Sequence, residues 1–498
     1  MFECRAKAGS IEIVISLQGE PAVMTPDYAL LGYPLGNNLA HLDTNNLGTT
    51  LRSVSGYFAF ISISRDRVTI STDITGGYRL YRYEEGSSIF ISDDYAALVE
   101  RLRDRRGVQI DESELQFWRR HRYTTGGRTF VKGIDKLEPA TIYSFTSEGE
   151  QTHCWFPDVE TRPNPRDHVV ASRVDIEKTL DLVQSTGAPV VLLFSGGADS
   201  TALAMLMRAQ GIDFTPVFFR SRPAYRTNLE DHTRAIRMAE RLGMSLLTLD
   251  VDIRDELEGG AFAKPMLFDR HVAVVHFVGM RAIAERLGRE AVIVCGQGAD
   301  SVLSLGPSQA TRGDLAARVL IFKRNGVLSR LAVAAVNVAY GPGWRRPKDD
   351  AEYLSAILNP RAYFPVVGRS DSVELANYVV EMTRGIASRF TSMASARMYL
   401  KIYGFLQGSD NQVVIQAARQ AGMERVVLPY VSPRFIINTL AHQSVRREIM
   451  QPKYVVREIL RTLNVPEPSA GAASQEDAVI DSDDLTTLTD RAYDREIE

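Results

Sequence analysis

Cysteine is scarce in this sequence: its 498 residues contain only Cys4, Cys154 and Cys295. These cysteines are far apart and form no Cys-x-x-Cys pair, which argues against a disulfide framework and against a zinc site. Long apolar runs are also missing, because the best one, near residues 331–340, is too short to span a bilayer. The N-terminus lacks the apolar segment of a signal peptide. We therefore expect a cytoplasmic protein without a membrane span.

An excess of charge of one sign is absent as well. The formal net charge is −3 at pH 7, so the composition gives no indication of a nucleic-acid partner or of an anionic membrane surface. A chain of this length is expected to form two or more domains with ample hydrophobic core. We expect a small-molecule or peptide substrate.

The most informative stretch present is Pro189–Thr201, which reads PVVLLFSGGADST. An apolar run rich in β-branched residues enters two glycines and continues into a helical pattern. The stretch therefore predicts a strand, a tight loop and the start of a helix. Unpaired N–H groups and the helix dipole favour an anion at such a helix start. Gly196 and Gly197 lack a Cβ, so that the backbone can approach a phosphate closely.

Three side chains in this loop suggest how it binds a phosphate. Ser195 and Ser200 offer hydroxyl donors, whereas the carboxylate of Asp199 would repel a phosphate unless a cation lay between them. Asp199 is therefore interpreted as a Mg²⁺ ligand. The loop contains no Lys-Ser or Lys-Thr pair, which excludes a Walker A P-loop. A glycine-rich connecting turn with Asp199 as a helix cap is the simpler alternative.

Patterns along the chain indicate its organisation. Short strand-like runs separated by turn residues fill residues 1 to about 150, and a polar, proline-rich segment follows at 156–165. Strand and helix patterns then alternate, which predicts a doubly wound parallel sheet. The expected strands are 190–194, 214–219, 246–250 and 291–295, and the expected helices between them run to 209, over 231–242 and over 271–287. Residues 310–465 are mostly helical in pattern, and residues 467–498 are expected to be an acidic, disordered tail.

The loop Ser195–Ser200, Ser-Gly-Gly-x-Asp-Ser in form, resembles the pyrophosphate loop of ATP pyrophosphatases, which cleave ATP to AMP and pyrophosphate. Nearly the whole chain is similar to the asparagine synthetase superfamily. Six segments carry this resemblance in the family's order: Gly56–Phe60, Asp73–Tyr81, Phe130–Pro139, Val294–Asp300, Arg425–Tyr430 and Pro452–Glu458.

The resemblance implies an α/β fold with two parts. Residues 1–155 would form a degenerate Ntn-type, glutaminase-like α+β sandwich. Residues 166–466 would form a synthetase domain with the doubly wound parallel sheet of ATP pyrophosphatases, followed by the tail at 467–498. The implied cofactors are ATP and Mg²⁺.

The resemblance also assigns roles to residues outside the first loop. Gly296 and Gly298 flank the second nucleotide-binding loop, and Asp300 falls where the family has its second Mg²⁺ ligand. Lys453 falls on the lysine that contacts the phosphates and the developing oxyanion. Asp300 as a helix cap and Lys453 as a solvated surface residue are the alternatives without function.

Two departures from the family pattern bear on the reaction. Glutamine-using members carry a catalytic cysteine directly after the initiator methionine, where this chain has Phe2, and Cys4 lies too far along to replace it. Glutamine-derived ammonia is therefore not expected. Gln297 stands where asparagine synthetases have Glu and β-lactam synthetases have Tyr. It can orient a substrate but cannot act as a base, so Asp410 is a candidate for the base.

Loss of the nucleophilic cysteine is shared by β-lactam synthetases and by the macrolactam synthetases of lasso peptides. The segment around Gln297 is more similar to the lasso-type enzymes, whose resemblance implies a leader-peptide protease as a partner. The leading interpretation is an AMP-forming carbon–nitrogen ligase that closes a ring with an amine of its own substrate. An asparagine synthetase-like ligase that uses free ammonia and a non-catalytic scaffold remain open as alternatives.

Overall fold

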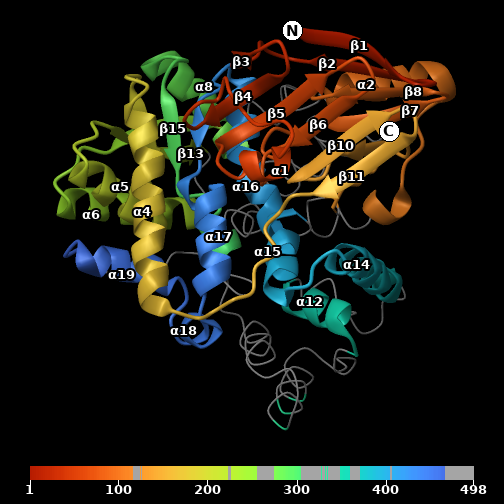
Figure 1. Ribbon diagram of the computed structural model, residues 1–498. Helices are drawn as coiled ribbons and strands as arrows, with labels where there is room; N and C mark the ends of the chain where they lie inside the picture. Colours follow the sequence, from red (N-terminus) through yellow and green to blue (C-terminus); the bar gives the residue numbers. More distant parts are fainter. Residues whose placement is uncertain are drawn as a thin grey trace.

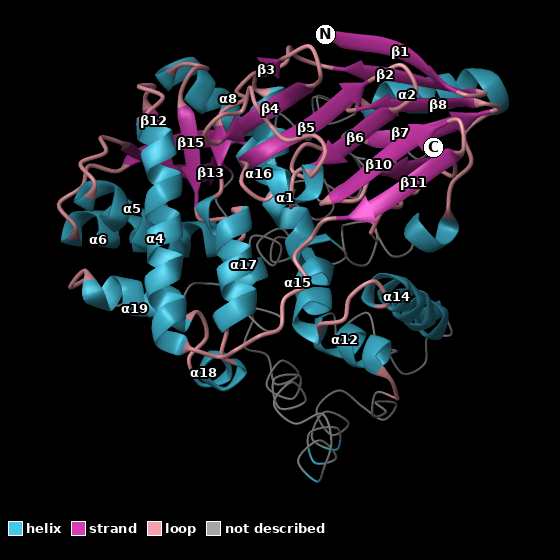
Figure 2. Ribbon diagram, in the orientation of Figure 1, coloured by secondary structure: helices cyan, strands magenta, loops and turns pink. Residues whose placement is uncertain are grey.

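A computed structural model describes residues 1–115, 124, 126–222, 226–254, 274–303, 348–358, 371–403 and 406–465, together with positions 327, 331 and 334. Within these residues the chain is a mixed α/β protein that contains a parallel sheet, as the sequence predicts (Figures 1 and 2). The predicted domain limits at 155, 166 and 466 stay predictions, and the expected tail at 467–498 lies outside the described residues.

The first 154 residues form two mainly antiparallel sheets, in the strand orders β1-β2-β8-β7-β9 and β11-β10-β6-β5-β4-β3. Burial alternates along strands such as β10, as expected for a sheet with one face on the core. Helices α1 (Leu47–Leu51) and α2 (Tyr95–Arg106) belong to this part. The strands are β1 (Phe2–Ala8), β2 (Ile11–Leu17), β3 (Val23–Met24), β4 (Ala29–Leu35), β5 (Ser55–Ile63), β6 (Val68–Thr72), β7 (Tyr81–Glu85), β8 (Ser88–Ser92), β9 (Ile134–Lys136), β10 (Thr141–Thr146) and β11 (Gly149–Cys154).

The third sheet is parallel throughout, in the order β14-β13-β12-β15-β16. Its central strands are continuous apolar runs, as expected where helices cover both faces of a sheet, and β15 is buried along its whole length. The strands are β12 (Val190–Leu193), β13 (Thr215–Arg222), β14 (Leu247–Asp252), β15 (Val292–Cys295) and β16 (Val426–Val427).

The strand order determines where a ligand site can form. From β12 the chain moves outward to β13 and β14, and then crosses back to place β15 on the other side of β12. Because such crossovers are right-handed, the helices before and after this reversal lie on opposite faces. The carboxyl ends of β12 and β15 are neighbours, with Leu193 paired to Cys295. A crevice opens at such a reversal point, where ligands of doubly wound sheets bind.

Helices account for most of the remaining described chain. Helix α4 begins with a side-chain cap: the Asn164 side chain accepts the N–H of Asp167, and Pro165 occupies the first turn. The helices are α4 (Pro165–Gln184), α5 (Ala198–Ala209), α6 (Arg226–Arg241), α8 (Val274–Leu287), α9 (Ala299–Leu303), α12 (Asp350–Leu358), α14 (Asp371–Ala387), α15 (Met393–Tyr403), α16 (Leu406–Gln420), the 3-10 helix η1 (Pro429–Val431), α17 (Pro433–His442), α18 (Val445–Met450) and α19 (Tyr454–Thr462).

Helix α16 joins the antiparallel sheets to the parallel one (Figure 1). Its Arg419 forms an ion pair with Asp93, at 2.6 Å, and the Asp93 side chain is only 1% exposed. The same guanidinium lies 4.3 Å from the centre of the Tyr78 ring, within the range of a cation–π contact. These contacts bind the first 154 residues to the part that carries the parallel sheet.

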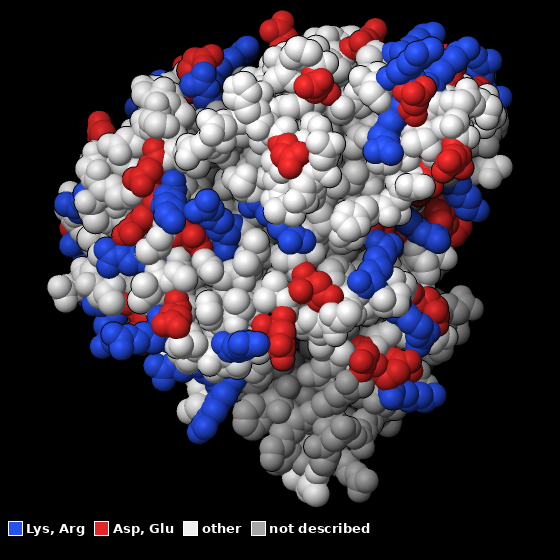
Figure 3. Space-filling view, viewed as in Figure 1, with Lys and Arg blue, Asp and Glu red and all other residues white. Residues whose placement is uncertain are grey.

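The surface charge and the polarity of the helices correspond to the balanced composition of the sequence. Acidic and basic side chains are interspersed over the face of the molecule in Figure 3. Among the described residues, no helix is both long enough and apolar enough to cross a membrane.

Two histidines are buried in the helical layers. His168 is 0% exposed and contacts the hydroxyls of Tyr454 and Thr439 at 2.7 and 3.2 Å. His276, which the sequence predicts to be a core or pocket-wall residue, is 7% exposed and packs edge-on against Phe219. Burial lowers the pKa of His168 to about 3 and that of His276 to about 4. Both side chains are therefore neutral in the folded protein at pH 7.

His276 is expected to make the folded protein sensitive to acid. Since its pKa falls from 6.5 to about 4 on folding, the unfolded chain binds a proton in this interval that the folded chain does not. The stability is fully present above pH 6.5 and falls below it, by about 1.4 kcal/mol per pH unit for this residue. In His276→Leu the free energy of unfolding should fall less steeply with decreasing pH, because one proton fewer is taken up on unfolding. Urea midpoints of both proteins at several pH values between about 7.5 and 5 measure the difference; equal slopes would contradict it.

Candidate active site

The loop after β12 has the predicted form of a strand, a tight turn and a helix start. Helix α5 begins at Ala198, and its N-cap Gly197 offers no side chain to the free N–H groups of the first turn. The Ser200 hydroxyl lies 3.3 Å from the backbone nitrogen and the hydroxyl of Ser195. Asp199 lies in the first turn of α5. The loop therefore combines free backbone donors, two hydroxyls and one carboxylate.

Gly196 is required by the shape of this loop. Its φ of +67° lies in the left-handed region, and a Cβ there would lie 2.8 Å from the carbonyl oxygen of Arg234 on α6. Arg234 also donates from Nε to the carbonyl of Ser195, at 3.2 Å, and forms an ion pair with Asp231. Helix α6 thus supports the outer side of the loop, which sequence reasoning missed.

Gly196→Ala is expected to destabilise the protein and to weaken ATP binding. The left-handed backbone alone costs about 1–2 kcal/mol with a Cβ, and the close approach to Arg234 forces the loop to move in addition. Gly187→Ala is the matched control, because Gly187 has a similar φ of +65° and nothing within 4 Å of its Cβ position. Urea denaturation and ATP titration of both variants measure the two effects. Wild-type ATP affinity in Gly196→Ala would show that the loop does not contact the nucleotide.

The second predicted loop follows β15 and lies beside the first. A Cβ on Gly296 would be 3.2 Å from the Cβ of Asp199, so the absence of a side chain lets the two loops touch. Gly298 has a φ of +88°, and Asp300 follows in the first turn of α9. Because β12 and β15 are adjacent parallel strands, the structure brings together the two carboxylates that the sequence predicts as metal ligands.

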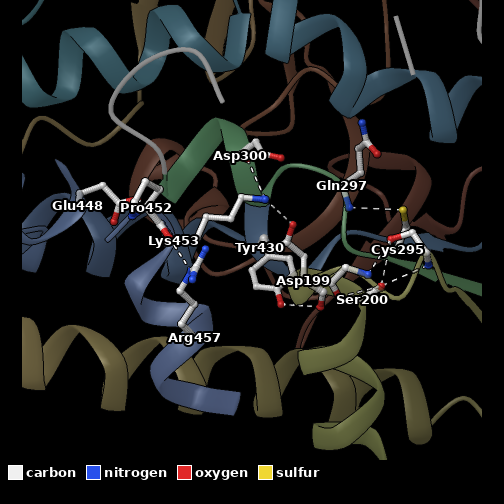
Figure 4. A network of polar contacts seen from close by, with 12 residues as sticks. Asp199, Ser200, Cys295, Gln297, Asp300, Tyr430, Glu448, Pro452, Lys453 and Arg457 are labelled. Carbon is white, nitrogen blue, oxygen red and sulfur yellow. Dashed lines mark hydrogen bonds and ion pairs between the residues drawn. The ribbon is translucent and has the colours of Figure 1, made fainter. Parts of the chain in front are cut away.

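Lys453 lies between these carboxylates (Figure 4). Its Nζ is 2.7 Å from Oδ2 of Asp199 and 2.8 Å from Oδ1 of Asp300. It precedes α19 as the N-cap residue and has a left-handed backbone, with φ 58° and ψ 35°. Its N–H donates to Oε1 of Glu448, which is 3% exposed. A strained backbone held by a buried carboxylate is characteristic of a functional position.

The Lys453 ammonium stabilises the charged forms of two carboxylates that repel each other. Burial alone would lower the pKa of Lys453, but the carboxylates of Asp199 and Asp300 outweigh it and raise this pKa well above its ordinary value. Burial raises the pKa of Asp199, the Lys453 ammonium opposes this shift, and the Asp300 carboxylate adds to it. The ammonium is therefore the main group that favours the ionised form of Asp199.

The site fits a magnesium ion that binds together with phosphates. Among the described residues, no three His, Cys, Asp or Glu side chains form a metal cluster by themselves. Mg²⁺ in nucleotide sites takes one or two carboxylates and completes its shell with phosphate oxygens and water. Asp199 Oδ1 is buried and has no hydrogen-bond partner among the described residues, so this oxygen is available to a cation.

Gln297 and Asp410 are the remaining residues that the sequence predicts for the site. The Gln297 N–H donates to Sγ of Cys295 at 3.4 Å, and its amide group extends away from the Lys453 ammonium (Figure 4). Asp410 belongs to α16, but its side chain lies outside the described part of the structure. A role for either residue stays a prediction.

Two contacts of the site were missed from the sequence. The Tyr430 hydroxyl donates to the Asp199 carbonyl at 2.9 Å, and Lys401 Nζ donates to the Asp300 carbonyl at 3.0 Å. Tyr430 belongs to one of the segments that resemble the family, and Lys401 is a charged residue within the largely buried helix α15. Neither contact could be predicted from the sequence, because the two partners of each hydrogen bond are far apart along the chain.

Cys4 does not have the properties of a nucleophile. Burial raises the pKa of its thiol to about 11, so that almost none of it is thiolate at neutral pH. It lies within β1, where it pairs with Ile15 of β2. All three cysteines are unpaired.

Neither a protein-family model nor a curated protein matches this chain. Among solved structures, an NH3-dependent NAD synthetase from Campylobacter jejuni is 15% identical, with a TM-score of 0.24, over 35% of this chain and 91% of that one. An NMN synthetase from Francisella tularensis is 12% identical, with a TM-score of 0.21, over 53% and 97%. A glutamine phosphoribosylpyrophosphate amidotransferase from B. subtilis is 12% identical, with a TM-score of 0.18, over 55% and 63%. Likenesses at these TM-scores support no conclusion about activity.

Proposed function

We propose that this protein is an ATP-dependent carbon–nitrogen ligase, which adenylates a carboxylate with release of pyrophosphate and then forms an amide. The observation that carries the proposal is the cluster of Asp199, Asp300 and Lys453 at the reversal point of the parallel sheet. Two carboxylates, one ammonium and a glycine loop at a helix start are the groups that a nucleoside triphosphate with its metal requires.

Each part of the site has a role in the proposed first step. The free N–H groups at the start of α5 and the hydroxyls of Ser195 and Ser200 would hold the terminal phosphates. Asp199 and Asp300 would hold Mg²⁺, which when bound neutralises charge on the leaving pyrophosphate. The substrate carboxylate then attacks the α-phosphorus, giving an acyl-adenylate and pyrophosphate.

In the second step an amine attacks the acyl carbon and AMP leaves. Lys453 would stabilise the oxyanion that forms at this carbon, as a cation fixed before the reaction. In that state Lys453 would no longer pair with the two carboxylates, and Asp199 and Asp300 would be free to hold the metal. Holding amine and activated acyl group together supplies much of the rate in a ring closure.

The amine is proposed to belong to the substrate itself. Phe2 stands where the resemblance would place the family's nucleophile, and burial raises the pKa of the Cys4 thiol to about 11, so we do not expect the amine to be ammonia derived from glutamine. The finer proposal is a lasso-peptide macrolactam or β-lactam synthetase, with residues 1–155 as a degenerate Ntn-type domain and 166–466 as the ATP pyrophosphatase domain. Gln297 would orient the amine or acyl-adenylate, and Asp410 would accept the proton. A leader-peptide protease would be the partner of a macrolactam synthetase.

Product analysis by mass spectrometry tests this function. Candidate core peptides and carboxyethyl amino acids are incubated with the protein, ATP and Mg²⁺, without ammonia. A product lighter than its substrate by one water, formed together with AMP, is expected for an intramolecular amide. A product that forms only when ammonia is added would favour the asparagine synthetase-like alternative. If no acid leads to AMP formation, the result favours neither the intramolecular amine nor free ammonia. Absence of ATP binding would indicate a non-catalytic scaffold.

A further inference from the structure

The helix that carries Asp300 depends on other elements for its position. Helix α9 has five residues, Ala299–Leu303, and the last four carbonyl groups of any α-helix have no partner within it. Buried carbonyls need partners from elsewhere. In α9, the carbonyls of Asp300 and Leu303 both accept hydrogen bonds from side chains of distant elements.

Helix α15 contacts one end of α9 directly and the other end through Gln443. Lys401 donates from Nζ to the Asp300 carbonyl at 3.0 Å. Gln443, directly after α17, donates from Nε2 to the Leu303 carbonyl at 3.0 Å, and its Oε1 accepts from Arg397 at 3.0 Å. Lys401 and Arg397 are four residues apart and share one face of α15.

Packing alone does not explain why position 401 carries a lysine. Lys401 is 3% exposed, and burial of an ammonium is far less favourable than burial of a neutral donor that would satisfy the same carbonyl. The residue it holds is Asp300, whose carboxylate is 2.8 Å from the Lys453 ammonium. Through the Asp300 carbonyl, Lys401 therefore links helix α15 to the residue whose carboxylate faces Lys453.

We propose that Lys401 is a positioning residue of the nucleotide site. It fixes the first turn of α9 through the Asp300 carbonyl, so that the Asp300 carboxylate remains directed toward Asp199, where the metal of the nucleotide would bind. Arg397 and Gln443 anchor the other end of the same helix. The proposal rests on the proposed ATP-dependent function.

Binding of ATP with Mn²⁺, measured from the paramagnetic signal of free Mn²⁺, tests this role. Lys401→Met is expected to weaken the binding of Mn²⁺ in the presence of ATP by about tenfold or more, as residues behind metal ligands typically do. Lys401→Arg keeps both the charge and the donor, and it should restore most of the affinity. Lys136→Met is the matched control, because Lys136 is also buried, at 9% exposure, and donates to Thr124 in another part of the chain. It should bind as the wild type does.

The possible outcomes separate this proposal from the function on which it rests. Wild-type affinity in Lys401→Met would overturn the positioning role while leaving nucleotide binding intact. Equal losses in Lys401→Met and Lys136→Met, with no rescue by Lys401→Arg, would also overturn it, since any buried lysine would then have the same effect. A wild-type protein that binds no Mn²⁺ with ATP would overturn the proposed function itself. Should Lys401→Met not fold, Lys401→Gln, whose amide is too short to reach the carbonyl, takes its place with the same expected loss.

Discussion

Asp199→Asn is expected to reduce substrate-dependent exchange of pyrophosphate into ATP by about 10³-fold, a loss typical of removing one charge-stabilising group from an active site. Asparagine keeps the shape of the side chain but removes the charge, and its amide nitrogen cannot bind a metal. The fold should be retained, because the Tyr430 hydroxyl bonds to the backbone carbonyl of this residue and not to its carboxylate.

Asp167→Asn is the matched control for Asp199→Asn. Asp167 lies in the first turn of α4 as Asp199 lies in the first turn of α5, so both carboxylates interact with a helix dipole. Exchange in Asp167→Asn should equal that of the wild type. Wild-type exchange in Asp199→Asn as well would mean that Asp199 only favours the helix start, and the metal-ligand assignment would be wrong.

Lys453→Met is expected to impair both the reaction and the stability of the metal-free protein. Without the ammonium, the carboxylates of Asp199 and Asp300 repel each other, and each loses its ion pair with Lys453. We expect a loss of about 2 kcal/mol in the free energy of unfolding, between the values typical of exposed and of fully buried ion pairs. Mg²⁺ should recover part of this loss by replacing the missing cation, and the urea midpoint should therefore depend on Mg²⁺ more strongly than in the wild type.

Lys453→Arg separates the charge of Lys453 from its shape. A guanidinium keeps the positive charge between the carboxylates, so most of the stability should return. Its planar fork does not reproduce the compact ammonium, and exchange should stay well below that of the wild type. If Lys453→Met were as stable as the wild type and indifferent to Mg²⁺, the ammonium would have no part in neutralising the two carboxylates.

The parallel sheet and its two loops could be predicted because their signals are local. Apolar runs of four to six residues followed by glycine mark β12 and β15, and the predicted strands match β12 to β15 to within three residues at each end. The neighbouring positions of Asp199 and Asp300 follow from the order of these strands. Strand β16 has two residues, which is too short for any periodic pattern to reveal.

The contacts that complete the site were beyond sequence reasoning because they join distant segments. Lys453 was assigned from a family motif within a helix, where a solvated side chain is the ordinary outcome; the structure places it before α19 in a left-handed conformation. Helix α6 was expected from Asp231 but begins at Arg226. The reason is tertiary: Asn228 accepts from the Ser221 N–H and donates to the Phe219 carbonyl, which fixes the first turn of the helix against β13.

The proposed function depends on the cleavage of ATP to AMP and pyrophosphate by a substrate carboxylate. Exchange of labelled pyrophosphate into ATP, with Mg²⁺ and a panel of amino acids, carboxyethyl amino acids and core peptides, tests it most directly. We expect pyrophosphate exchange with one of these acids and no exchange when acid is omitted. Exchange should also be lost in Asp199→Asn. ATP consumption that yields ADP and phosphate, or bound ATP that no acid in the panel brings into exchange, would contradict the account.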